Sequence, residues 1–146
     1  MNLKIKLASS KNDLEDVLKI RKRVFIKEQQ IPASIEIDEN ENKSFYILAY
    51  FESQPVGTAR WRDSMEGIKL ERFAVLKQFR KKGIGSALTD FIIDRVPKDR
   101  KIYLNSQRSA IGFYEKLGFV AEGPTFKEAD ITHQRMIYYR KSYKKA

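Results

Sequence analysis

The chain has 146 residues, of which 42% are hydrophobic and 12% aromatic, and this composition predicts one folded domain over residues 1–146. It contains no cysteine, which excludes disulfides, a cysteine-ligated zinc site and a thiol nucleophile. The net charge of +10 favours polyanionic partners such as nucleic acid or a phosphate-bearing cofactor. No apolar stretch is long enough to span a membrane and no signal-peptide core is present, so a cytoplasmic location is expected.

The N-terminal segment predicts a strand followed by a helix. Leu3, Ile5 and Leu7 alternate with lysines, which indicates a half-buried strand. Ser10 or Asn12 is expected to cap the helix, and Glu15 stands in a capping-box relation to Asn12. Five residues at helical spacing mark the apolar face: Leu14, Val17, Leu18, Val24 and Phe25. Arg21 falls on the same face, and Pro32 is expected to stop the helix by Ile31.

The segment that follows carries an acidic cluster, made of Glu36, Asp38, Glu39 and Glu41. Two interpretations stay open for it. It is a solvated loop that aids solubility, or it attracts a cationic amine to a nearby site.

Three apolar runs then predict an antiparallel meander: Phe45–Phe51, Val56–Arg62 and Ile68–Val75. Gly57 is expected at a bulge. Glu71 lies two residues before Phe73, so a regular strand would place both side chains on one face with Val75.

A basic turn with two glycines joins the third strand to a helix predicted from Ile84 to about Val96. Gly83 and Gly85 allow close approach to the backbone, and the N-terminus of the helix offers unpaired N–H groups. The turn therefore predicts a site for phosphate, most simply a diphosphate. It lacks the lysine of a P-loop and the third glycine of a dinucleotide-binding fingerprint.

The C-terminal part predicts a strand at Lys101–Leu104, a helix and two more strands, at Phe119–Val120 and Thr132–Arg140. The apolar face of the helix is formed by Ala110, Phe113, Tyr114 and Leu117, and Gly118 is its expected C-terminal stop. The predicted fold class is therefore α/β, a mixed sheet with helices on its faces.

Four ordered segments resemble the GNAT superfamily of N-acetyltransferases and, within it, the ElaA-like subfamily. They are the Arg80-x-x-Gly83-x-Gly85 turn, the Ala110–Phe119 segment, the Val24–Gln29 segment followed by Glu36-x-Asp38, and the Phe126–Met136 segment. Three positions depart from the usual pattern. Asp130 replaces a glycine, Ser44 stands where members commonly have a histidine, and Gln107 replaces the asparagine of most members.

The resemblance implies the GNAT acyl-CoA N-acyltransferase fold, a central mixed and mostly antiparallel sheet flanked by helices. It implies direct acetyl transfer from acetyl-CoA to a primary amine of a small molecule or peptide in a ternary complex. One histidine and no cysteine argue against a metal, the lack of a long apolar stretch argues against a membrane, and the scattered basic residues argue against nucleic acid. The resemblance also implies a set of cofactor-binding residues: Phe73, Ala74, Val75, Arg80, Lys81, Lys82, Gly83, Ile84, Gly85, Ser86, Gln107, Ala110 and Phe113. A homodimer formed through the final strands is kept as an open expectation.

The resemblance also implies catalytic and acceptor-binding residues. Tyr114 occupies the tyrosine position that protonates the departing thiolate. Glu71, Glu28 or a water molecule is expected to accept the amine proton. Glu28, Gln29 and His133 are the expected acceptor-binding residues. The acceptor itself stays open among polyamines, aminoglycosides, peptide N-termini and lysine side chains.

Three alternative functions are kept beside this one. The first is a silent sensor that binds acyl-CoA without turnover. The second is a basic nucleic-acid-binding module, suggested by the charge. The third is an acyl-homoserine-lactone synthase, which shares the Arg-x-x-Val-Phe pattern at Arg21–Phe25.

Overall fold

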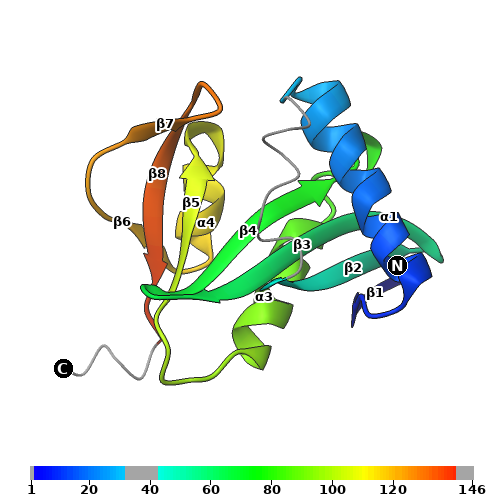
Figure 1. The fold of residues 1–146 in the computed structure, drawn as a ribbon, viewed down its shortest axis with the longest axis horizontal. Coiled ribbons are helices and arrows are strands. Elements are labelled where there is room, and N and C mark those ends of the chain that lie inside the picture. Colours follow the sequence, from blue (N-terminus) through cyan, green and yellow to red (C-terminus); the bar gives the residue numbers. More distant parts are fainter. Residues whose placement is uncertain (1, 32–42, 141–146) are drawn as a thin grey trace. The chain divides into compact units, whose positions relative to one another are not determined.

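The structure is a computed structural model that describes residues 2–31 and 43–140 (Figure 1). The helices and strands follow in chain order: β1 (Leu3–Leu7), α1 (Lys11–Arg21), η1 (Lys22–Glu28), β2 (Phe45–Phe51), β3 (Gln54–Ser64), β4 (Gly67–Val75), η3 (Lys77–Phe79), α3 (Ile84–Arg95), β5 (Ile102–Gln107), η4 (Arg108–Ala110), α4 (Ile111–Lys116), β6 (Phe119–Ala121), β7 (Phe126–Glu128) and β8 (Ile131–Tyr138). The strands and helices expected from the sequence are confirmed, with ends that differ by a few residues.

The strands form a mixed sheet, in the order β1-β2-β3-β4-β5-β8-β6, with β7 paired to β8. The β4–β5 pair is parallel, whereas β1–β2, β2–β3 and every pair made by β8 are antiparallel. The chain folds as two compact units. One holds the described residues up to Arg62 together with Glu71–Arg95, and the other holds Asp63–Leu70 and the residues from Val96 onward. The predicted fold class is confirmed.

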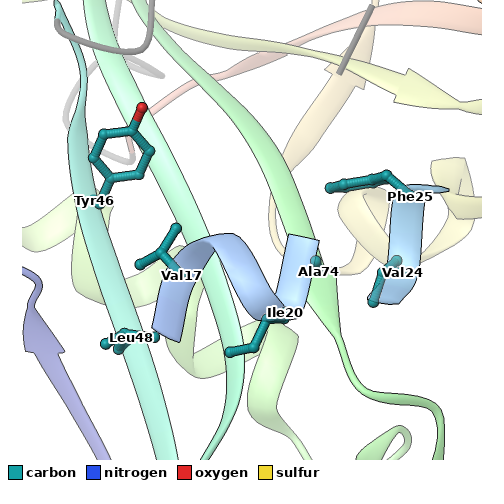
Figure 2. Close-up of a cluster of buried hydrophobic side chains, with 7 residues drawn as sticks. All are labelled: Val17, Ile20, Val24, Phe25, Tyr46, Leu48 and Ala74. Carbon is teal, nitrogen blue, oxygen red and sulfur yellow. The ribbon is translucent and has the colours of Figure 1, made fainter. Parts of the chain in front are cut away.

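In the first unit, β2 is buried on both faces, which explains its continuous apolar sequence. Tyr46 and Leu48 belong to a cluster with Val17 and Ile20 of α1 (Figure 2). Ala49 lies on the opposite face, where a Cβ added at Gly57 would come within 3.1 Å of Ile84 in α3 and 3.5 Å of Ala49. Figure 1 shows α1 in front of these strands and α3 behind them. Gly57 therefore gives α3 room to pack closely.

The start of α1 differs from the prediction in its capping pair. Ser10 is the cap, because its hydroxyl accepts a hydrogen bond from the Asp13 N–H at 3.0 Å. The capping-box acid is Asp13, so the predicted relation between Asn12 and Glu15 is wrong. Asp13 also binds the Lys6 ammonium at 3.1 Å.

The buried face of α1 also differs in part. Val17, Val24 and Phe25 are buried as predicted, and Arg21 on the same face is buried with them. Leu14 and Leu18, in contrast, are 38% and 37% exposed. Ile20 takes the core position instead.

After Arg21 the helix widens into the π-helical segment η1. The Gln29 N–H donates to the carbonyl of Val24, five residues earlier, at 3.0 Å. Single π-helical turns inside α-helices occur often at functional sites. No sequence pattern predicted this change, because periodicity alone does not separate the two helix types over seven residues.

The second unit pairs β8 with β5, β6 and β7. The short strand β7 is a hairpin partner that the sequence analysis missed. Gly118 follows the end of α4 with φ +102°, so its predicted role as the C-terminal stop is confirmed. Across residues 2–31 and 43–140, no helix is long and apolar enough to cross a membrane.

Candidate functional site

The glycine turn opens α3 with a backbone suited to an anion. The Ala87 N–H donates to the Gly83 carbonyl at 3.0 Å, which is the first helical bond of α3. The N–H groups of Ile84, Gly85 and Ser86 therefore have no partner within the helix. Gly83 adopts φ +82°, and nothing lies within 4 Å of the place where a Cβ would stand. The turn thus has open space beside N–H groups of the kind that bind anions, and phosphate binding there stays a prediction.

Arg80 has a role that the sequence did not indicate. Its guanidinium makes two bonds of 2.7 Å to the two carboxylate oxygens of Glu28, and its Nε donates to the Val75 carbonyl at 2.8 Å. The pKa of the Glu28 carboxyl lies below its ordinary value of 4.5, and the hydrogen bonds from Arg80 are the largest cause of this shift. The positive charge of Arg80 lowers the pKa further. Glu28 is therefore ionised and bound to Arg80, which leaves it poorly placed to accept an amine proton.

The two lysines of the turn are exposed. Lys81 adopts φ +63°, and the Lys82 ammonium lies 5.9 Å from the centre of the Phe51 ring. Both charges therefore remain at the surface beside the N-terminus of α3.

The strand before the turn contains a backbone irregularity at Arg72, which adopts φ +59°. Such a conformation is strained for a residue with a side chain and recurs at functional sites. It interrupts the pleat between Glu71 and Phe73, so their spacing of two residues no longer fixes a shared face. Ala74 is buried in the core cluster, whereas Phe73 and Val75 are partly exposed.

Glu71 is enclosed by arginines. One of its oxygens, Oε2, lies 2.6 Å from Arg60 Nη2, 2.8 Å from Arg60 Nε and 2.9 Å from Arg62 Nε. The Arg60 side chain is fully buried and that of Glu71 is 10% exposed. Protonating this carboxylate would break ion pairs with two guanidinium groups, so the geometry weighs against Glu71 as a general base.

Tyr114 belongs to the second unit, on α4. It is 7% exposed, and its ring packs edge-to-face against those of Phe113 and Phe119. The distances between ring centres are 4.9 Å to Phe113 and 5.6 Å to Phe119. Burial raises the pKa of its hydroxyl well above the ordinary value of 10.0. A phenol that stays protonated is suited to donate a proton.

Three other candidates lie near one another in the second unit. Gln107 ends β5 and pairs in register with His133 of β8, and Ala110 follows in η4. The His133 Nδ1 lies 2.7 Å from the Ile131 carbonyl, so this nitrogen carries the proton and donates. Its Nε2 lies 3.6 Å from the Glu128 carboxylate, and its ring stacks on Phe126. These contacts are made to the β7–β8 hairpin and fit a structural role.

The acidic cluster of Glu36, Asp38, Glu39 and Glu41 lies outside the described residues, so its predicted attraction for a cationic amine stays a prediction. Gln29 follows η1 and is half-buried. In the described ranges, no group of three or more histidine, aspartate or glutamate side chains is placed to hold a metal ion.

Sequence reasoning missed Arg60 and Arg62. Both stand in a strand that was predicted from its apolar character, two residues apart and thus on one face. A charged pair on one face of a buried strand is a signal for an acidic partner, and that partner is Glu71.

Comparisons with known proteins, by sequence and by structure, indicate the family of this chain. The sequence profile described as "Acetyltransferase (GNAT) domain" matches residues 9–140. The uncharacterized N-acetyltransferase YjcF of Bacillus subtilis is 37% identical over 139 residues, covering 92% of this chain and 99% of YjcF. The crystal structure of Escherichia coli ElaA has a TM-score of 0.82 at 22% identity, covering 94% of this chain and 100% of that chain.

An acyl-CoA N-acyltransferase from Pseudomonas aeruginosa has the same fold, with a TM-score of 0.80 at 22% identity, covering 94% of this chain and 99% of that chain. Because the profile spans most of the chain and the YjcF match is close to full length, the chain belongs to the GNAT acetyltransferase family and is an acyltransferase.

Proposed function

We propose that this enzyme transfers an acetyl group from acetyl-CoA directly to a primary amine of a small molecule or peptide, through a ternary complex. The observation that carries the proposal is the turn at Gly83, which has φ +82° and open surroundings and leads into the first N–H groups of α3, which have no partner within the helix. This turn fits the diphosphate of coenzyme A. The Pseudomonas aeruginosa protein with the same fold is an acyl-CoA N-acyltransferase, which supports the same class of donor.

Bound acetyl-CoA would supply a thioester, which an amine attacks to give an amide and a thiol. We assign Tyr114 as the general acid that protonates the sulfur, because its buried hydroxyl keeps its proton at neutral pH. Phe73 and Val75 would offer backbone groups to the pantetheine amides, in the manner of an added strand. Gln107, Ala110 and Phe113 stay proposed contacts of the cofactor.

The amine must be neutral to attack, and its proton needs an acceptor. Glu28 and Glu71 are both engaged by arginines, as described above. We therefore propose that the proton leaves through water and that Glu71 holds Arg60 and Arg62 in place. A cytoplasmic location and a homodimer stay predictions.

The proposal is tested by measuring thiol release from acetyl-CoA with a panel of amines that includes polyamines, aminoglycosides and peptides. Release that depends on an amine, together with a product heavier by one acetyl group, is the expected result. Acetyl-CoA binding without release for every amine would favour the silent sensor. DNA binding that coenzyme A does not displace would favour the nucleic-acid-binding module.

Gly83→Val is expected to raise the dissociation constant of acetyl-CoA by at least about tenfold. Valine is strained at φ +82°, so the turn would change shape, and its side chain would fill the space left for the phosphate. Isothermal titration calorimetry measures the effect.

Gly123→Val is the matched control, because Gly123 has φ +79° and equally open surroundings but lies between β6 and β7. Both variants should lose similar stability, and only Gly83→Val should lose acetyl-CoA affinity. Equal affinity in the two variants would contradict the assignment of the turn.

A further inference from the structure

A pocket in the first unit lies outside the glycine turn. It is lined by Arg23, Lys27 and Glu28 of η1 and by Lys77 and Gln78 of η3. Because the bonds of a π-helix span five residues, positions four and five apart lie on one side of it. The widening of the helix after Arg21 therefore directs Arg23, Lys27 and Glu28 toward the same pocket.

The pocket is positively charged. The negative charge of Glu28 is balanced by its two 2.7 Å bonds to Arg80. Lys77 is attracted by Glu28 at longer range, because its charge helps to lower the pKa of that carboxyl. Among residues 2–31 and 43–140, the side-chain hydrogen bonds of Glu28 go to Arg80 and to none of Arg23, Lys27 and Lys77. Three cations around one pocket repel one another, and an anion that bridges them would relieve this repulsion.

The pocket also adjoins the proposed cofactor turn within the same unit. η3 leads directly into that turn. Arg80, at the start of the turn, donates hydrogen bonds to Glu28 of η1 and to the carbonyl of Val75 at the end of β4. A molecule held at the turn, or a second substrate beside it, could place an anionic group here.

We propose that Arg23, Lys27 and Lys77 form a second anion-binding site, which holds a carboxylate or phosphate group of a bound substrate apart from the diphosphate. This inference rests on the proposed function. The anionic group belongs either to the amine acceptor or to the 3′ end of the coenzyme, and the two sources are separated below by the ligands used.

The test compares ligand pairs that differ only in the anionic group. One pair is coenzyme A and 3′-dephospho-coenzyme A. The other is an amino acid and its carboxamide, titrated into enzyme saturated with coenzyme A, across the common amino acids. Calorimetry gives all dissociation constants, so the test needs no turnover.

The variant Arg23→Gln/Lys27→Gln/Lys77→Gln removes the pocket charges. Lys4→Gln/Lys11→Gln/Lys19→Gln is the matched control, because it removes three exposed charges of the same unit outside the pocket. In the pocket variant, the preference for the anionic member of one pair should fall by at least about tenfold, whereas the control should keep it.

Loss of preference within the coenzyme pair identifies the 3′-phosphate as the occupant, and loss within an amino-acid pair identifies the acceptor. Unchanged preferences in both pairs, or equal losses in the pocket and control variants, overturn the inference. Failure of wild-type enzyme to bind coenzyme A at all would instead count against the proposed function.

Discussion

Tyr114→Phe is expected to lower turnover about 10²–10⁴-fold, the usual contribution of a general acid, while acetyl-CoA affinity changes little. The variant removes one hydroxyl and keeps the ring that packs against Phe113 and Phe119. The fold and the binding of the cofactor should therefore survive, and only protonation of the departing thiolate should suffer. Thiol-release kinetics give the turnover number, and calorimetry gives the affinity.

The pH dependence provides a second readout for this residue. Burial raises the pKa of Tyr114 above 10.0, so the hydroxyl stays protonated as the pH rises from neutrality to that value. Wild-type turnover should therefore show no loss from tyrosine ionisation below about pH 10. Tyr139→Phe is the control, because Tyr139 is 45% exposed and lies beyond the end of β8. Unchanged turnover in Tyr114→Phe would refute the assignment of the acid.

Glu71→Ala is expected to lower the free energy of unfolding by about 3–5 kcal/mol, the usual cost of removing one partner from a buried ion pair. Arg60 is fully buried, and the variant would leave its guanidinium without this carboxylate. Urea denaturation followed by circular dichroism measures the change.

Two further variants separate this effect from a general loss of charge. Glu66→Ala removes an exposed carboxylate that binds Arg135 at 2.7 Å, and it should cost no more than about 1 kcal/mol. The double variant Arg60→Met/Glu71→Leu removes both buried charges and should recover much of the stability lost in Glu71→Ala. A stable Glu71→Ala protein with greatly reduced turnover would instead support the original hypothesis that Glu71 is the general base.

The sequence by itself predicted the features that depend on local order. The glycine turn, the apolar run of β2 and the stop at Gly118 arise from residues close together in the chain, whose backbone preferences act without distant partners. The similarity to GNAT acetyltransferases likewise followed from short segments in a fixed order, and the comparisons confirmed the family.

The partners of the acidic residues were decided by tertiary structure. Spacing suggested Glu71 as a base on the face of Phe73, but the left-handed backbone at Arg72 breaks the alternation, and Arg60 and Arg62 bind the carboxylate. A regular pattern cannot report a single unusual φ angle.

Glu28 is a second acidic residue whose partner only the folded chain reveals. Its sequence context suggested a residue that binds the acceptor, yet the structure pairs it with Arg80, which lies 52 residues away. Only the folded chain brings η1 beside the turn and creates the basic pocket of Arg23, Lys27 and Lys77. The sequence alone predicted the family from four ordered segments, and it predicted the fold class and the glycine turn from periodic apolar residues and local backbone preferences. The tertiary structure decided which charges neutralise one another, because ion pairs depend on distances that sequence spacing does not set.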